Sequence, residues 1–344
     1  MVSEKNSGKP GQEPAIHSHK SYVLTADPCE HADSLPAWRQ EYTQLRPGAF
    51  KGEIAEAAFG PVQVFRETIE QCVDEKANPR RDSYTVGVPV RVSQGGLWQG
   101  RELTDDSVMS LRPNEELYFK TPLYSSILVT VIDCNALNRL AESIEKSDIE
   151  ALTRRPHALP GRIETVEGFR QVLTQTLDFA LSQPQALAYP AIVDTLSDTV
   201  MQAVLTVLED EDTAPKRHAY GQTVQRAIVE RARSYVIANR HRPVTVSELC
   251  EHLKMSRRGV HHAFVNVLGI NAITFLRYVK LHRIRKRLLQ ADPTDTVSSI
   301  AFSWGFWHMG MFASYYKQLF GESPSATLKR TTNVNTKTDH IIVG

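Results

Sequence analysis

The spacing of apolar residues along the chain changes near residue 133. Before that point, apolar and polar residues alternate over short runs separated by turn residues such as Gly60-Pro61, and this period of two is typical of β-strands. We expect strands at 52–59, 62–69, 84–92, 97–100, 108–111, 117–120 and 126–133. Short strands at this spacing predict a compact β-sandwich or small barrel.

Helical spacing dominates the rest of the chain. Apolar residues three or four positions apart predict helices around Leu137 to Ile144, at 166–182 and at 190–208. A serine cap followed by Pro36 predicts one more helix, at 34–45, before the strands begin. The acidic run at 209–212 indicates a solvated linker, and the first 30 residues have the polar composition of a disordered tail.

An internal repeat organises the last third of the chain. A helical pattern that ends at Gly269 recurs 52 residues later and ends at Gly321, and the helix before it recurs at an offset of 51. The pairs at the offset of 52 include Val260 with Phe312, Phe264 with Tyr316, Val267 with Leu319 and Leu268 with Phe320. A helix, a tight turn and a second helix, present twice, predict two DNA-reading units, since the second helix of this motif enters the major groove.

The two copies and the segment between them carry specific motifs: SELCEHLKMSRRGVHHAF, LGINAITFLRYVKLHRIRKRLL, SSIAFSWGFW and YYKQLFGESPSATL. In these motifs, over about 244–328, the chain resembles the AraC/XylS family of transcriptional regulators. The resemblance implies an α+β protein with a β-rich sensor domain and a C-terminal all-α domain, in which a long helix joins two helix-turn-helix motifs. It also implies a bacterial regulator that binds double-stranded operator DNA and works with RNA polymerase, usually as an activator. A homodimer is expected, through the first domain or the helices between Val166 and Leu208, because operators are often paired, and the scattered cysteines indicate a reducing cytoplasm.

The segment AWRQEYTQLRPGAFKGEIAEAAFGPVQVFRETIEQ, residues 37–71, resembles the start of the sensor domain of the ethanolamine-utilisation operon regulator subgroup. That resemblance implies a cupin-like β domain and a small effector, an amine such as ethanolamine, with or without a cobalamin. No other cofactor and no metal are expected. The expected domains are a tail at 1–30, an effector-sensing and dimerisation domain at 31–212, a linker with a lead-in helix at 213–232, a DNA-binding domain at 233–332 and a tail at 333–344.

Charge separates the two parts of the chain. Residues 216–344 hold 20 Lys and Arg against 7 Asp and Glu, a net charge of +13, whereas residues 1–215 carry a net charge of −12. A basic third beside an acidic remainder indicates a polyanionic partner for that third.

Outward positions on the second helix of each copy are the candidates for DNA contact. In the first copy, Arg258 can bond a guanine edge twice, and His261 and His262 can donate to or accept from bases or phosphates. The second copy offers small or apolar residues that suit thymine methyls, so we expect the first copy to supply most of the specificity. A joining helix at 272–289 is expected to hold the two copies about one DNA turn, ~34 Å, apart. The candidate DNA-binding residues are Arg257, Arg258, His261, His262, Arg283, His308, Met309, Gly310, Ala313, Ser314 and Lys317.

Aromatic residues among the predicted strands are candidates for an effector site inside the barrel. Together with one carboxylate they are Trp38, Tyr42, Phe65, Glu67, Tyr84, Trp98 and Tyr118. The period of two places Phe65 and Glu67 on one face of a strand, and a carboxylate beside an aromatic ring would suit an amine. The alternative is that Glu67 points to water and the aromatic side chains fill the core.

Several classes of protein find no support in the sequence. It contains no GxSxG, HExxH, P-loop or Rossmann glycine motif, so we do not expect an enzyme. Four scattered cysteines without a CxxC pair indicate free thiols, and neither a membrane span nor a signal peptide is expected. Two functions remain: an effector-responsive transcription factor, and a DNA-binding architectural or interaction protein that senses nothing.

Overall fold

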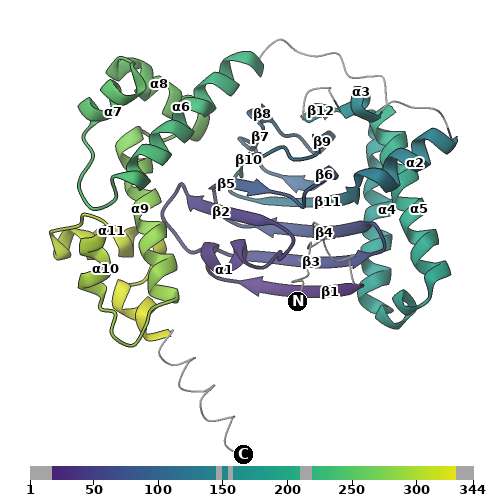
Figure 1. Ribbon diagram of the computed structural model, residues 1–344, viewed down its shortest axis with the longest axis horizontal. Helices are drawn as coiled ribbons and strands as arrows, with labels where there is room; N and C mark the ends of the chain where they lie inside the picture. Colours follow the sequence, from purple (N-terminus) through teal and green to yellow (C-terminus); the bar gives the residue numbers. More distant parts are fainter. Residues whose placement is uncertain (1–17, 145–148, 154–157, 210–218, 331–344) are drawn as a thin grey trace, which may run out of the picture.

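The computed structural model describes residues 18–144, 149–153, 158–209 and 219–330, and these form a β-rich half and a helical half that lie side by side (Figure 1). The β-rich half comprises residues 18–209, and the helical half begins at Ala219. The α+β class that the sequence predicts is therefore confirmed. The expected tail at 333–344 and the start of the expected linker lie outside the described residues.

Two antiparallel sheets form the β-rich half. The larger sheet has the strand order β1 (His19–Thr25), β3 (Gly52–Phe59), β4 (Val62–Ile69), β11 (Ser125–Asp133), β6 (Ser83–Val92), β9 (Ser107–Leu111) and β12 (Ala158–Pro160). The smaller sheet has the order β2 (Arg39–Gln44), β5 (Val73–Asn78), β10 (Leu117–Lys120), β7 (Leu97–Trp98) and β8 (Arg101–Glu102). Side chains from both sheets, among them Phe65, Trp98 and Phe119, form one buried core between them, as the alternating pattern predicts.

Helices cover the outer face of the larger sheet (Figure 1). They are α2 (Cys134–Ile144), α3 (Ile149–Thr153), α4 (Ile163–Ser182) and α5 (Pro190–Glu209), with a short 3-10 helix at Pro184–Ala188. Phe169, Leu173 and Leu177 share the inner face of α4 and join Val200 and Val204 of α5 in a second core. By length and composition alone, α5 is apolar enough to cross a membrane, although no membrane span is expected from the sequence. The inner face of α5 is buried in this second core.

Two expectations for the start of the chain are wrong. Residues 34–45, expected as a helix, form a turn and strand β2, and residues 18–30, expected in the tail, form β1 and most of α1 (Pro28–Ala32). In β2, Tyr42 bonds inward to Glu67 while Glu41 bonds outward to the helical half, so the strand period overrides the helix start that Pro36 suggests. The sequence does not predict strand β5, because the strand is polar on both faces. Asp74 on one face pairs with Arg226 of the helical half, and Glu75 on the other face is buried.

The helical half contains the predicted repeat. Its helices are α6 (Ala219–Ala238), α7 (Val246–Leu253), α8 (Arg257–Leu268), α9 (Ala272–Leu289), α10 (Val297–Ser303) and α11 (Met309–Phe320), followed by a helical segment at 324–330. Thr245 and Thr296, 51 residues apart, both form capping boxes, and Gly269 and Gly321, 52 apart, both end a helix in the left-handed conformation. We refer to α7 with α8 as the first unit and to α10 with α11 as the second unit.

Each unit has its own core, and α9 contributes to both. Phe275 and Val279, from the first half of α9, pack in the core of the first unit, and Leu281 and Leu288 pack in the core of the second. Helix α6 belongs to the first core on both sides of residue 232, the point at which the sequence predicts the domain to begin. That boundary therefore cuts through a continuous helix.

The turns within the two units each contain one residue in the left-handed conformation, but the residue differs. Lys254 in the first unit and Gly305 in the second, 51 residues later, both have left-handed φ angles, of 54° and 76°. A Cβ atom on Gly305 would lie 3.0 Å from backbone atoms of Arg242, so the position excludes side chains by contact as well as by φ.

Replacing Gly305 by alanine should lower the free energy of unfolding by about 1–2 kcal/mol, because of the left-handed φ alone, and the contact with Arg242 adds to this. Gly310→Ala is the matched control: it lies in α11 with nothing within 4 Å of the added Cβ, so it should raise stability by up to about 1 kcal/mol. Chemical denaturation followed by circular dichroism measures both. Equal effects of the two substitutions would contradict the tight packing of the second turn.

Candidate nucleic-acid interface

Helix α8 turns four of the predicted DNA-binding residues toward solvent. Arg257 and Arg258 follow the cap residue Ser256, and His261 and His262 lie one turn further on; all four are exposed. Because residues three or four apart share a helix face, Arg258, His261 and His262 form one strip. This strip carries a guanidinium and two imidazole rings, which are donors suited to base edges and phosphates.

Helix α11 presents the equivalent strip of the second unit. Gly310, Ser314 and Lys317 are exposed, while Met309 and Ala313 are half-buried. His308 is exposed at the cap position and makes no side-chain capping bond. The strip therefore offers one hydroxyl and mostly apolar surface to bases, with an imidazole and an ammonium at its ends.

Three exposed apolar side chains beside this strip were not predicted. Trp307, Met311 and Phe302 are 59%, 54% and 39% exposed, and the rings of Phe302 and Trp307 stack with centroids 5.9 Å apart. They flank His308 at the start of α11, where the second helix of such a motif approaches DNA. Trp307 and Met311 lie outside the apolar positions that face the core. This mismatch in the helical period is the sequence signal from which their exposure could have been predicted.

The structure places Arg283 on a different surface from the predicted one. It lies on α9, and its guanidinium donates to Glu41 of β2 at 2.6 Å, so Arg283 contacts the β-rich half. At least six basic residues of the helical half form such pairs. The others are Arg226 and Arg233 with Asp74, Arg285 and Arg330 with Asp27, and Lys286 with Asp33. Part of the net charge of +13 is thus neutralised within the chain and is not available to DNA.

Two of these arginines are enclosed by the protein. Arg233 and Arg285 are each 3% exposed, and their partners Asp74 and Asp27 are fully buried. Burial alone would raise the pKa of the Asp27 carboxyl, but the charge and hydrogen bonds of Arg285 hold that pKa below its usual value. Removing one member of such a buried pair typically costs about 3–5 kcal/mol, because the other charge is left without a partner. The two pairs therefore join the β-rich half to α6 and α9, the helices that pack against the first and second units.

The aromatic candidates for effector binding do not line one cavity. Trp38, Phe65 and Trp98 fill the core between the sheets, and Tyr84 packs on the opposite face of the larger sheet. The prediction that these rings surround a ligand is therefore wrong, because they make the apolar contacts that join the sheets. This outcome matches the alternative that the aromatic side chains fill the core.

The alternative is wrong for Glu67, however, which is 3% exposed and does not reach water. It accepts a hydrogen bond from the Tyr42 hydroxyl at 2.7 Å and lies 3.1 Å from Nε2 of His31. Glu75 is also buried nearby. Its burial, together with the charge of Glu67, raises the pKa of the Glu75 carboxyl well above the usual value. Within the described residues, no group of three or more His, Cys, Asp or Glu side chains is arranged to hold a metal ion.

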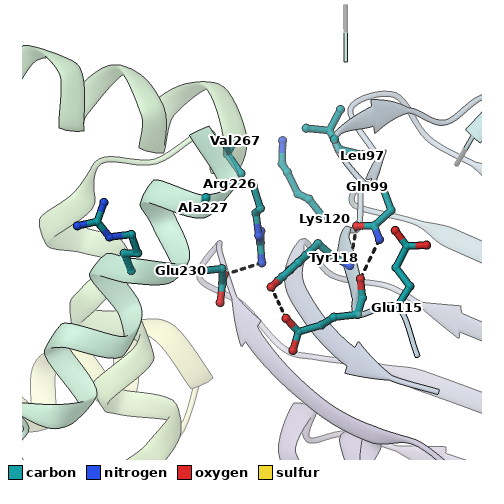
Figure 2. A pocket seen from close by; sticks show the side chains of 12 residues that line it. Leu97, Gln99, Glu115, Tyr118, Lys120, Arg226, Ala227, Glu230 and Val267 are labelled. Atoms are coloured by element: carbon teal, nitrogen blue, oxygen red, sulfur yellow. Dashed lines mark hydrogen bonds and ion pairs between the residues drawn. The ribbon is translucent and has the colours of Figure 1, made fainter. Parts of the chain in front are cut away.

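Tyr118 lines a pocket of about 560 Å³ between the two halves (Figure 2). The β-rich half supplies Leu97, Gln99, Glu115, Glu116 and Lys120, and the helical half supplies Arg226, Glu230 and Val267. The Arg226 guanidinium lies 4.3 Å from the centroid of the Tyr118 ring and pairs with Glu230 at 2.9 Å. The volume suits a small molecule, and any ligand there would touch both halves.

Comparisons with known proteins find similarity to transcriptional regulators. A family model described as a helix-turn-helix domain matches residues 249–330. A "probable thc operon regulatory protein" of Rhodococcus erythropolis is 30% identical over 293 residues, which are 81% of this chain and 86% of the relative. The XylDLEGF operon transcriptional activator 1 of Pseudomonas putida is 36% identical over 104 residues, 29% of this chain and 31% of the relative. A solved structure from Rhodopseudomonas palustris, titled a probable AraC family transcriptional regulator, is 34% identical and covers 30% of this chain and 97% of its own, with a TM-score of 0.29.

The chemistry of the two strips predicts unequal contributions to specificity. On a duplex that the protein selects from a random pool, Arg258→Ala should cost about 1–3 kcal/mol of binding free energy and relax the preference at one base pair. Ser314→Ala should cost less, and Lys317→Ala should weaken the selected duplex and a scrambled one alike, because a phosphate contact does not read sequence. Competition binding measures all three. A larger loss of specificity from Ser314→Ala than from Arg258→Ala would reverse the assignment.

Proposed function

The chain belongs to the AraC/XylS family of transcriptional regulators, and on that premise we propose that it reads an operator with both units and alters transcription when a small molecule binds its β-rich half. One observation carries the proposal. The strips on α8 and α11 are exposed to solvent, while α6 and α9, which pack against the two units, are bound to the β-rich half through Asp74 and Asp27. A protein built this way has its DNA-reading surface free and its control domain already attached.

The direction of control that we propose is activation. The relatives from Pseudomonas putida are named as transcriptional activators, and the match to them lies in the DNA-binding part. An activator must contact RNA polymerase, so we propose the polymerase as a partner, in the bacterial cytoplasm. We also propose a homodimer, formed through the β-rich half or through α4 and α5, because operators are often paired.

The pocket between the halves is the effector site that we propose. The carboxylates of Glu115 and Glu116 pair with Arg112 and Lys76, and Arg226 lies over the ring of Tyr118. These groups already bind cations of the protein, so an ammonium ion would replace one of those cations, whereas Lys120 can donate to an oxygen. This pairing supports a small amine that also carries an oxygen, and ethanolamine is such a molecule. A cobalamin is larger than a pocket of about 560 Å³, so we do not place one there.

Ethanolamine should raise the melting temperature of the full chain, because a ligand that binds only the folded state stabilises it, by about 2.7 kcal/mol at a hundred times its Kd. Tyr118→Leu should abolish this shift. Tyr124→Leu is the matched control, since Tyr124 lies in the same half, packs beside Arg91 and does not line the pocket. The site assignment fails if the Tyr118→Leu variant responds as the wild type does, and the effector assignment fails if the wild type shows no shift.

Transcription in vitro separates regulation from an architectural role. With a bacterial RNA polymerase and a promoter placed beside the selected operator, the effector should increase the transcript made in the presence of the protein. An architectural or interaction protein that senses nothing would give the same transcript level with and without the effector. That result would favour the second function left open by the sequence.

A further inference from the structure

Lys280 lies at the point on α9 where one core ends and the other begins. The residue before it, Val279, packs in the core of the first unit, and the residue after it, Leu281, packs in the core of the second. Lys280 itself is only 8% exposed. A charged side chain is thus buried at the junction of the two DNA-reading units.

The ammonium group of Lys280 donates to three backbone carbonyls that come from both sides of this junction. It bonds the carbonyl of Arg242 at 2.8 Å and that of Arg240 at 3.2 Å, in the segment between α6 and α7. It also bonds the carbonyl of Trp304 at 3.2 Å, at the end of α10 in the second unit. Carbonyls at helix ends and in turns have no partner within a helix, and an ammonium has three N–H groups, so one side chain satisfies all three.

Packing alone does not explain a lysine at this position. Burial, together with the charge of Arg242, lowers the pKa of Lys280 to about 8, and the group is still mostly protonated near pH 7. Burying an ammonium is costly unless it is fully hydrogen-bonded, and a methionine of similar length would avoid that cost. Here the three carbonyls offset that cost, because each N–H group of the Lys280 ammonium donates one hydrogen bond.

The same segments also touch each other directly. The backbone of Arg242 lies against Gly305, where an added Cβ would be 3.0 Å away, and the Arg240 guanidinium lies 5.6 Å from the centroid of the Trp304 ring. We call this set of contacts around Lys280 the joint. Because the three acceptors of the ammonium group are backbone carbonyls from both sides of the junction, one buried side chain can fix the position of one unit relative to the other.

We propose that Lys280 is a positioning residue that fixes the spacing of the two units and thereby the number of base pairs between the two blocks that the protein recognises. It needs no contact with DNA to do so. Each base pair added between the blocks rotates one block by about 34°, given 10–10.5 base pairs per turn, so a rigid joint tolerates few changes in spacing. The proposal concerns DNA reading and holds whether or not the effector assignment is correct.

The test is the affinity of the full chain for duplexes that carry both selected blocks at the selected spacing or with one to three base pairs inserted or removed. The wild type should lose at least about tenfold in affinity when the spacing changes by two base pairs, as expected when a linked second site can no longer be reached. Lys280→Met should bind the native spacing about tenfold more weakly and vary less than about threefold across the series. Its affinity for a duplex with the first block alone should be unchanged, a result that general destabilisation would not give.

Lys286→Met is the matched control, since Lys286 lies on the same helix but pairs with Asp33 of the β-rich half. It should keep the wild-type spacing profile. Lys280→Gln retains two N–H donors and should give an intermediate profile, which keeps the test informative if the methionine variant is unstable. A sharp spacing profile in both Lys280 variants, or an equal loss on one-block and two-block duplexes, would overturn the proposal.

A second measurement needs no DNA. Spin labels placed at Val265 and Gln318, exposed positions on the two recognition helices, report the distance between the units. The wild type should give a narrow distance distribution and Lys280→Met a broad one, with helical content unchanged by circular dichroism. An equally narrow distribution in the variant would show that the joint does not need the ammonium group.

Discussion

Helix α9 packs against three parts of the protein, the two units and the β-rich half, and the rest of the structure depends on these contacts. Its first half packs in the core of the first unit, its second half packs in the core of the second, and Arg283 and Arg285 face the β-rich half. A helix enclosed in this way cannot have a single apolar stripe. It instead buries Lys280, His282 and Arg285 within two turns, and each finds a specific polar partner.

His282 joins α9 to the β-rich half through one of its two ring nitrogens. Its Nε2 atom accepts a hydrogen bond from the backbone N–H of Gln44 in β2 at 2.8 Å. Burial, together with the nearby charge of Arg285, lowers the pKa of His282 to about 3, so the ring is neutral and can accept that bond. The side-chain amide of Gln44 in turn donates to the carbonyl of Leu319 at the end of α11, at 3.0 Å. The β-rich half thus contacts the second unit through a hydrogen bond from a side-chain amide to a backbone carbonyl, and it contacts α9 through charge.

This arrangement suggests how a bound ligand would be sensed. The exposed strips on α8 and α11 are not covered by the β-rich half, so control by masking the DNA-reading surface is not what the geometry favours. The pocket touches α6 through Arg226, and Arg226 also pairs with the buried Asp74 at 2.5 Å. A ligand that competes for Arg226 would therefore act on the contact between the β-rich half and α6, which packs in the core of the first unit. Such a ligand would change the orientation of the first unit and not the exposure of its DNA-reading strip.

The sequence predicts the helical half far better than the effector site, for physical reasons. Apolar periodicity, caps and a glycine at each helix end are local signals, and they place α9, α11 and the repeat offsets of 51 and 52 correctly. Strand β5 and the role of Arg283 depend on charges that pair across the two halves, and no local pattern reveals such a partner. Tyr118 and Phe65 look alike in sequence, yet one faces the pocket and the other the core, because which face of each strand meets the core is known only from the fold.

Selection of binding sites from a random pool of duplexes by the full chain tests the central claim most directly. Two units held on one rigid helix should select two blocks of base pairs about 10 base pairs apart, so that both face the same side of the duplex. The first block should show a strong guanine preference beneath Arg258, and the second should be weaker and rich in thymine, as the apolar strip on α11 predicts. A single block, or two blocks whose separation varies freely, would contradict the account of two units fixed on α9.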